Sequence, residues 1–144
     1  MRAALCLGML LAIAAPALAE DWPAAIKAEL DDRQAYCKDQ GEEAKIGATF
    51  LRRMDLDGDG REDFIMDDAG FGCTKGAPPY CGSGGCSIQV FIGGEKDARL
   101  VFSELAQQVA LKGKVLEVAP RRGRKITVRF ERGCAIRSDG ERSC

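Results

Sequence analysis

One stretch, Asp55-Leu56-Asp57-Gly58-Asp59-Gly60-Arg61-Glu62-Asp63-Phe64-Ile65-Met66, predicts a turn and the strand that follows it. Aspartate and glycine in alternation favour a tight turn, and the apolar run after Asp63 favours a strand. Residues 46–54, which precede the turn, also have strand character. We therefore predict a β-hairpin whose connecting loop carries four carboxylates.

These four carboxylates make the loop a candidate cation site. Like charges so close together repel one another unless a cation or a cationic side chain lies between them. Ca²⁺ takes about six to eight oxygen ligands in flexible geometry, whereas Mg²⁺ demands a stricter octahedron and keeps its waters. We therefore expect Ca²⁺ at Asp55, Asp57, Asp59 and Asp63. The alternative is an acidic turn that binds nothing.

Two known calcium loops have a similar spacing of carboxylates. An EF-hand needs a glutamate at its twelfth position, but the twelfth residue counted from Asp55 is Met66, which does not ligate. The stretch instead resembles the Asp-x-Asp-Gly-Asp-Gly-x-x-Asp loop of FG-GAP and VCBS-type repeats. That resemblance implies Ca²⁺ bound by the four aspartates and by the backbone carbonyl of Arg61, within a β-hairpin. Because those families build propellers from several copies, a single copy implies the loop and not the fold.

A second resemblance covers most of the chain. Small exported bacterial proteins of unassigned function combine such a loop with a downstream Cys-Gly-x-Gly-Gly-Cys, here residues 81–86. This likeness implies no activity.

The first nineteen residues have the pattern of a signal peptide. Arg2 precedes an apolar run, and Ala17 and Ala19 give a small-x-small cleavage site. We expect residues 1–19 to be removed and residues 20–144 to form one exported domain, periplasmic or secreted, with no membrane insertion after cleavage. The alternative is a retained N-terminal anchor.

Cysteine use agrees with export. Residues 20–144 contain an even number, which in an oxidising compartment predicts three disulfides in one of about 15 pairings. The six residues are Cys37, Cys73, Cys81, Cys86, Cys134 and Cys144. Free or metal-bound thiols are the alternative.

The chain contains no histidine, which excludes Ser-His-Asp and Cys-His catalysis and most catalytic zinc sites. Residues 20–144 carry 20 basic and 22 acidic side chains, a net charge of −2, which favours neither nucleic acid nor membrane binding. Residues 20–68 have a net charge of −8 and residues 112–132 a net charge of +6. The basic segment is either a patch for an anionic partner or a set of ordinary edge-strand and turn residues.

The periodicity of the chain predicts an α+β fold that is mostly β. Residues 22–40 fit one amphipathic helix, capped by Asp21, with Ile26, Leu30 and Cys37 on the buried face. Short apolar runs separated by glycine-containing turns follow. We expect the helix to pack on an antiparallel sheet or small sandwich of six or seven strands, with residues 70–86 as an irregular loop and residues 104–108 as a strand or a helical turn.

We therefore expect a non-enzymatic, exported calcium-binding module, monomeric, that recognises a protein or glycan of the cell envelope. Two alternatives remain: a metal-assisted hydrolase that uses the acidic loop, and a purely structural domain with an EF-hand-like cation site. Asp67 and Asp68 either extend the cation site or cap the loop that follows them.

Overall fold

The computed structural model describes residues 21–144, so the expected signal peptide lies outside the described residues. It contains one α-helix, α1 (Ala24–Asp39), one 3₁₀ helix, η1 (Asp68–Gly70), and twelve strands in three antiparallel sheets. The strands are β1 (Ala44–Ile46), β2 (Leu51–Met54), β3 (Asp63–Asp67), β4 (Phe71–Cys73), β5 (Cys81–Gly82), β6 (Gly85–Gly93), β7 (Ala98–Ala106), β8 (Gln108–Lys112), β9 (Val115–Ala119), β10 (Ile126–Glu131), β11 (Cys134–Arg137) and β12 (Arg142–Ser143).

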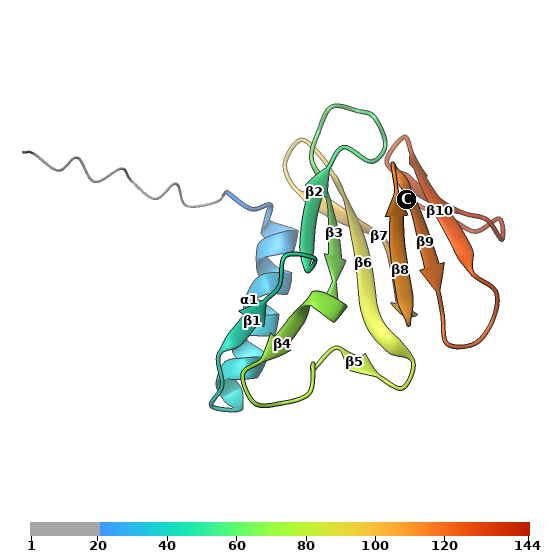
Figure 1. Ribbon diagram of the computed structural model, residues 1–144. Coiled ribbons are helices and arrows are strands. Elements are labelled where there is room, and N and C mark those ends of the chain that lie inside the picture. The colour runs from blue at the N-terminus through green and yellow to red at the C-terminus, as the bar shows by residue number, and fades with distance from the viewer. Residues whose placement is uncertain (1–20) are drawn as a thin grey trace, which may run out of the picture.

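Three layers stack on one another (Figure 1). The central sheet has the order β2-β3-β6-β5, with β7 on the other side of β6. Helix α1 and the small β1–β4 ladder cover one face of this sheet, and the outer sheet, β12-β11-β10-β9-β8, covers the other. The chain passes from the central to the outer sheet directly, from β7 into β8. The prediction of a helix on antiparallel sheets is confirmed.

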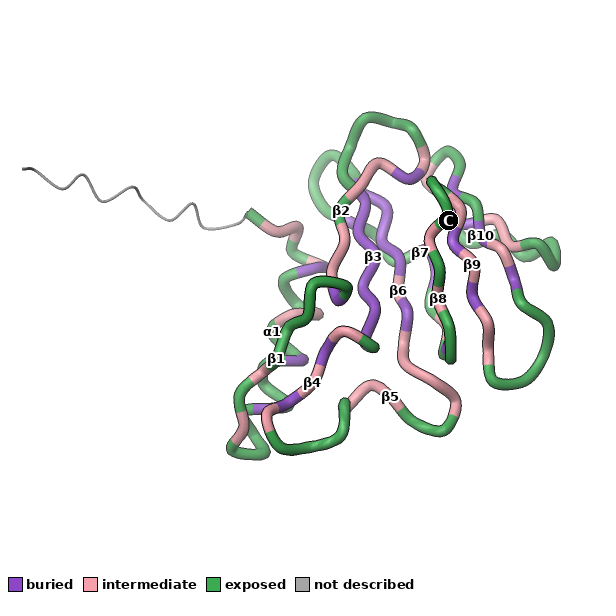
Figure 2. Tube along the Cα trace, in the orientation of Figure 1, coloured by how far each residue is buried: buried purple, intermediate pink, exposed green. Residues whose placement is uncertain are grey.

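The central sheet is buried on both faces, which explains why every residue of β3 is buried (Figure 2). Alternate side chains of a strand point to opposite faces. Ile65 accordingly joins the core between the two sheets, while Phe64 and Met66 join the core beneath α1. Six phenylalanines are at most 5% exposed: Phe50, Phe64, Phe71, Phe91, Phe102 and Phe130.

Helix α1 begins later than the sequence predicts. Pro23 is its N-cap residue and supplies no capping side chain, so the prediction that Asp21 caps the helix is wrong. The backbone N–H of Ala25 instead donates to Asp97 Oδ1, at 3.0 Å, in the turn between β6 and β7. A residue distant in sequence therefore satisfies the helix terminus.

The number of strands is larger than the predicted six or seven. The run 46–54 is not one strand, because the chain turns at residues 47–50 and places Phe50 in the core with no exposed surface. Residues 70–86 are not wholly irregular, since they include β4 and β5. Residues 104–106 end β7 and Gln108 begins β8, so the helical turn is excluded. Strands β11 and β12 were not predicted.

All six predicted cysteines form disulfides, with the pairing Cys37–Cys73, Cys81–Cys86 and Cys134–Cys144. The first ties α1 to β4, the second closes the β5–β6 hairpin, and the third holds the C-terminal strand on β11. Three disulfides fit an oxidising compartment. Among residues 21–144, none of the helical segments has the length and apolar character that a membrane span requires.

Candidate metal centre

The predicted hairpin forms as expected and presents the acidic loop at one end of the central sheet. Strands β2 and β3 pair antiparallel, with Met54 opposite Asp63. Gly58 and Gly60 adopt φ of 84° and 85°, a region that glycine enters without steric cost. The loop therefore has the tight conformation that its two glycines predict.

Three of the four predicted carboxylates converge. Asp55, Asp57 and Asp63 each place one carboxylate oxygen within 4.8 Å of the other two. Oxygen atoms at this spacing are compatible with one ion bound at about 2.3–2.6 Å from each. This cluster can therefore hold a metal ion.

The remaining predicted ligands lie differently. Asp59 is not part of the three-carboxylate cluster, and its Oδ2 lies 2.9 Å from Nη1 of Arg61 in an ion pair. Coordination by Asp59 would require this exposed pair to open, a small cost because such pairs contribute about 0–1 kcal/mol. The backbone carbonyl of Arg61 stays a predicted ligand.

Asp63 is the buried anchor of the loop, with no exposed surface. Its Oδ2 accepts hydrogen bonds from the backbone N–H of Leu56 (2.6 Å) and of Asp57 (3.4 Å). Its Oδ1 accepts from the N–H of Gly93 (2.8 Å). A β-carbon at Gly93 would lie 2.1 Å from the carbonyl oxygen of Glu62, so only glycine permits this approach. Asp63 thus fixes the loop to β6.

The electrostatics of the cluster differ from one carboxylate to the next. Desolvation, with a further contribution from the charge of Asp57, raises the pKa of Asp63, although three backbone N–H groups oppose the shift. Desolvation also raises the pKa of Asp55, but hydrogen bonds from Gly58 and Gly60 and the charge of Lys114 outweigh it, so this pKa is lowered. The ammonium of Lys114 is 3.8 Å from Asp55 Oδ1. The cationic side chain of Lys114 thus stabilises the negative charge of Asp55, whereas backbone N–H groups stabilise that of the buried Asp63.

Sequence reasoning missed the contribution of the β10–β11 turn. The backbone N–H of Gly133 donates to Asp57 Oδ2 at 2.7 Å, across 76 positions of sequence. A hollow of about 310 Å³ lies here, lined by Asp57, Asp59, Arg61, Asp97, Arg99 and Arg132 among others. The dipeptide Arg132-Gly133 is a turn signal, but nothing in the sequence says that this turn reaches the acidic loop.

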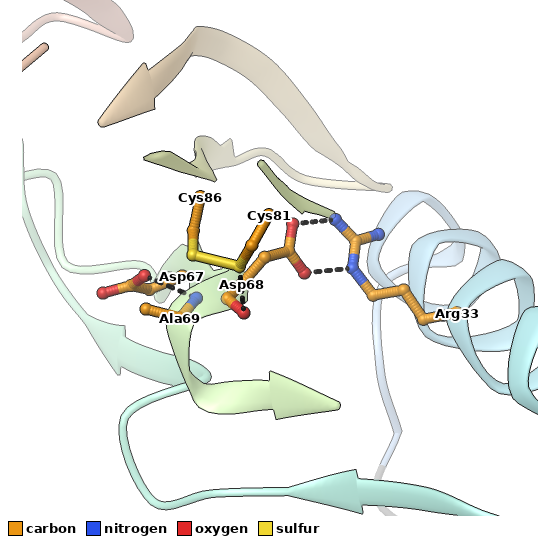
Figure 3. Close-up of a disulfide and its surroundings, with 6 residues drawn as sticks. All are labelled: Arg33, Asp67, Asp68, Ala69, Cys81 and Cys86. Carbon is orange, nitrogen blue, oxygen red and sulfur yellow. Dashed lines mark hydrogen bonds and ion pairs between the residues drawn. A yellow bond between two sulfur atoms is a disulfide. The ribbon is translucent and has the colours of Figure 1, made fainter. Parts of the chain in front are cut away.

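Asp67 and Asp68 do not join the site, because they lie at the opposite end of β3 from Asp63. Asp67 Oδ1 accepts from the N–H of Ala69 at 3.1 Å and caps η1 (Figure 3). Asp68 forms a buried ion pair with Arg33, at 2.7 Å from Nε and 2.8 Å from Nη2. Of the two roles predicted for these residues, Asp67 therefore has the capping role.

Other residues around the Arg33–Asp68 pair also interact with the guanidinium of Arg33. Arg33 also donates to Glu29 and Gln89, and its guanidinium carbon is 4.5 Å from the centre of the Tyr80 ring. Desolvation lowers the pKa of Arg33, but the hydrogen bonds and charges of Asp68 and Glu29 outweigh it, so the pKa is raised. This pair stabilises the attachment of α1 and offers no free charge for a cation.

Comparison of the chain with protein-family models, with curated proteins and with solved structures found no match.

Proposed function

We propose that this protein is an exported, non-enzymatic calcium-binding module that recognises a protein or glycan in the periplasm or outside the cell. The observation that carries the proposal is the convergence of the carboxylates of Asp55, Asp57 and Asp63, of which Asp63 is fully buried. The loop spacing, which resembles that of FG-GAP and VCBS-type repeats, favours Ca²⁺ over Mg²⁺. Three disulfides support an oxidising destination.

The expected affinity is modest. Extracellular calcium modules bind with Kd of about 10⁻⁴–10⁻³ M, because exported proteins meet millimolar calcium. At a calcium concentration about tenfold above Kd, binding would stabilise the fold by about 1.4 kcal/mol. Calcium would therefore order one end of a fold that its disulfides and two cores already hold.

Calorimetric titration of metal-stripped, oxidised protein tests this proposal. We expect one saturable calcium site in the wild type and at least a tenfold loss of affinity in Asp57→Asn. Asp39→Asn removes an exposed carboxylate at the end of α1 and should bind as the wild type does. Absence of binding heat up to millimolar calcium, or equal affinity in both variants, would overturn the calcium site.

Partner recognition needs a separate experiment. Immobilised protein should retain a component of the cell envelope in calcium and release it in EDTA, and the Asp57→Asn variant should retain much less. Equal retention by wild type and variant would contradict calcium-dependent recognition.

One observation favours the alternative, a metal-assisted hydrolase. The hollow beside Asp57 contains a further carboxylate, Asp97. Yet Asp97 Oδ1 already accepts from the backbone N–H of Ala25 and of Ala98. That oxygen therefore already ties the turn between β6 and β7 to the start of α1. A calcium-dependent cleavage of envelope glycans that is lost in Asp97→Asn would establish the hydrolase instead.

A further inference from the structure

The hollow beside the acidic loop, called here the loop-side pocket, is built by three separate turns. They are the β2–β3 loop, the β6–β7 turn and the β10–β11 turn. Hydrogen bonds lock them together: Gly133 N–H to Asp57, Gly93 N–H to Asp63, and Arg99 Nη2 to the carbonyl of Gly133 at 3.0 Å. The pocket is therefore preformed, which lowers the entropic cost of binding a ligand.

The charges that line the loop-side pocket balance one another. Three aspartates and three arginines give a net charge of zero; they are Asp57, Asp59, Asp97, Arg61, Arg99 and Arg132. A divalent cation on Asp57 and its neighbours would add two positive charges. Together with Asp55 and Asp63, the other two carboxylates of the cluster, the pocket carries a net charge of −2, which a divalent cation would bring to zero. Cation binding would thus lower the repulsion that an anionic ligand meets.

Two of the three arginines have donors to spare. Arg61 is neutralised by Asp59 and by Glu95, at 2.9 and 3.6 Å. Arg99 uses one nitrogen on a backbone carbonyl, and the side chain of Arg132 makes no hydrogen bond or ion pair to any residue from 21 to 144. A guanidinium presents a planar fork of donors that matches a carboxylate.

Arg132 also has an uncommon backbone. Its φ of 51° is the one positive value of a non-glycine residue among residues 21–144. This conformation costs about 1–2 kcal/mol in a residue with a β-carbon, and such strain is concentrated at functional sites. Asparagine or glycine would fit the turn better, so the arginine brings a side chain that the turn itself does not need.

The lining favours a sugar over a peptide. Ile92 is the one residue in the lining that has an apolar side chain. The volume of the pocket, about 310 Å³, is at the lower end of the range for ligand sites. The pocket therefore suits one small, polar ring. Asp97 Oδ2 accepts no hydrogen bond within the described chain and can accept one from a hydroxyl.

We propose that the loop-side pocket binds the carboxylate of a hexuronate residue of an acidic glycan through Arg99 and Arg132. Asp97 accepts a hydrogen bond from a sugar hydroxyl, and a cation in the neighbouring loop strengthens the binding. This inference rests on the proposed calcium site and names the chemistry of the partner.

The test uses ¹⁵N-labelled protein and four probes, which are D-glucuronate, D-glucose, glucose 6-phosphate and a tri-glutamate peptide. In calcium, glucuronate should shift the amide resonances of Gly93, Gly94 and Gly133 saturably, and glucose should not. In EDTA the glucuronate affinity should fall at least threefold. Stronger shifts by the peptide or the phosphate than by glucuronate would overturn the assignment to uronate, as would equal affinity in calcium and EDTA.

Matched variants locate the ligand. Arg132→Asn removes the guanidinium, relieves the positive φ and should reduce glucuronate affinity at least tenfold without loss of thermal stability. Arg129→Asn makes the same change at an exposed position on β10 outside the pocket and should bind as the wild type does. Unchanged affinity in Arg132→Asn would contradict the inference.

Calcium calorimetry on the same samples separates the two proposals. Calcium binding without any glucuronate shift overturns the loop-side pocket but leaves the calcium site. Absence of calcium binding overturns both the calcium site and its effect on the pocket.

Discussion

Asp63 begins β3 and Asp68 directly follows the last residue of that strand, and both are buried, at 0% and 1% exposure. Asp68 has its counter-charge inside the protein, because two nitrogens of Arg33 contact it. Asp63 accepts hydrogen bonds from three backbone N–H groups, and one carboxylate oxygen each of Asp55 and Asp57 lies within 4.8 Å of its own. Asp68 therefore has its counter-charge within the protein, whereas the three carboxylates at the other end of β3 could hold a metal ion.

This difference predicts a structural end and a binding end. The helix end contains the Arg33–Asp68 pair and the Cys37–Cys73 disulfide, which hold α1 in place. The loop end contains the acidic loop and two turns that lie beside it. Changes at the helix end should lower stability and leave calcium binding intact, whereas changes at the loop end should weaken calcium binding and alter stability less.

The largest expected effect is at the helix end. Arg33→Met leaves Asp68 as an unpaired buried charge, which should cost about 3–5 kcal/mol of unfolding free energy in urea. Calcium affinity should not change. The double variant Arg33→Met, Asp68→Leu replaces the pair with apolar side chains and should recover most of the loss. A single variant as stable as the wild type would show that the pair is not needed.

A smaller loss is expected from the Cys81–Cys86 disulfide, which lies next to Asp68 (Figure 3). It closes a short segment, since the two cysteines are five positions apart. Replacing both by serine should therefore cost about 2 kcal/mol in urea unfolding, by the chain-entropy account. Calcium binding should persist. Loss of calcium binding in this variant would mean that the two ends of β3 are coupled.

Calcium removal should have a still smaller effect. EDTA should lower the stability by about 1.4 kcal/mol relative to calcium at about tenfold above Kd. For a domain of this size, the melting temperature should fall by about 5 °C. Asp57→Asn should show no such difference between calcium and EDTA. A wild-type melting temperature that does not respond to EDTA would count against the site.

The smallest effect concerns Tyr80, whose hydroxyl donates to Asp32 at 2.8 Å. Burial, followed by this hydrogen bond, raises the pKa of Tyr80 from 10.0 to about 12. A raised pKa means that the neutral form stabilises the fold, so this contribution is complete below pH 10 and is lost towards pH 12. Absorbance titration of wild type against Tyr80→Phe should assign the late ionisation. A Tyr80 that ionises near pH 10 would contradict this environment.

Sequence reasoning succeeded where local pattern decides the structure. Alternating glycine and aspartate predicted the hairpin, and an even number of cysteines predicted that all six are bonded. It failed where distant segments decide. Phe50 enters the core because the chain turns before it, and the contact of Gly133 with Asp57 depends on how the two sheets stack.

The same distinction applies within the site. The carboxylates of Asp55, Asp57 and Asp63 were predicted from spacing alone, and the structure brings them together. The arginines of the loop-side pocket come from different strands and turns, so no local spacing announces them. For Arg132 the sequence offered one usable signal, its position directly before a glycine in a hairpin turn.

The most direct test of the comparison is a calcium titration of metal-stripped, oxidised, ¹⁵N-labelled protein, followed through its amide resonances. Our account predicts saturable shifts at Gly58, Gly60, Gly93 and Gly133, around the loop end, and none at Ala69 beside Asp68. Shifts of equal size at both ends of β3, or none at the loop up to millimolar calcium, would contradict it.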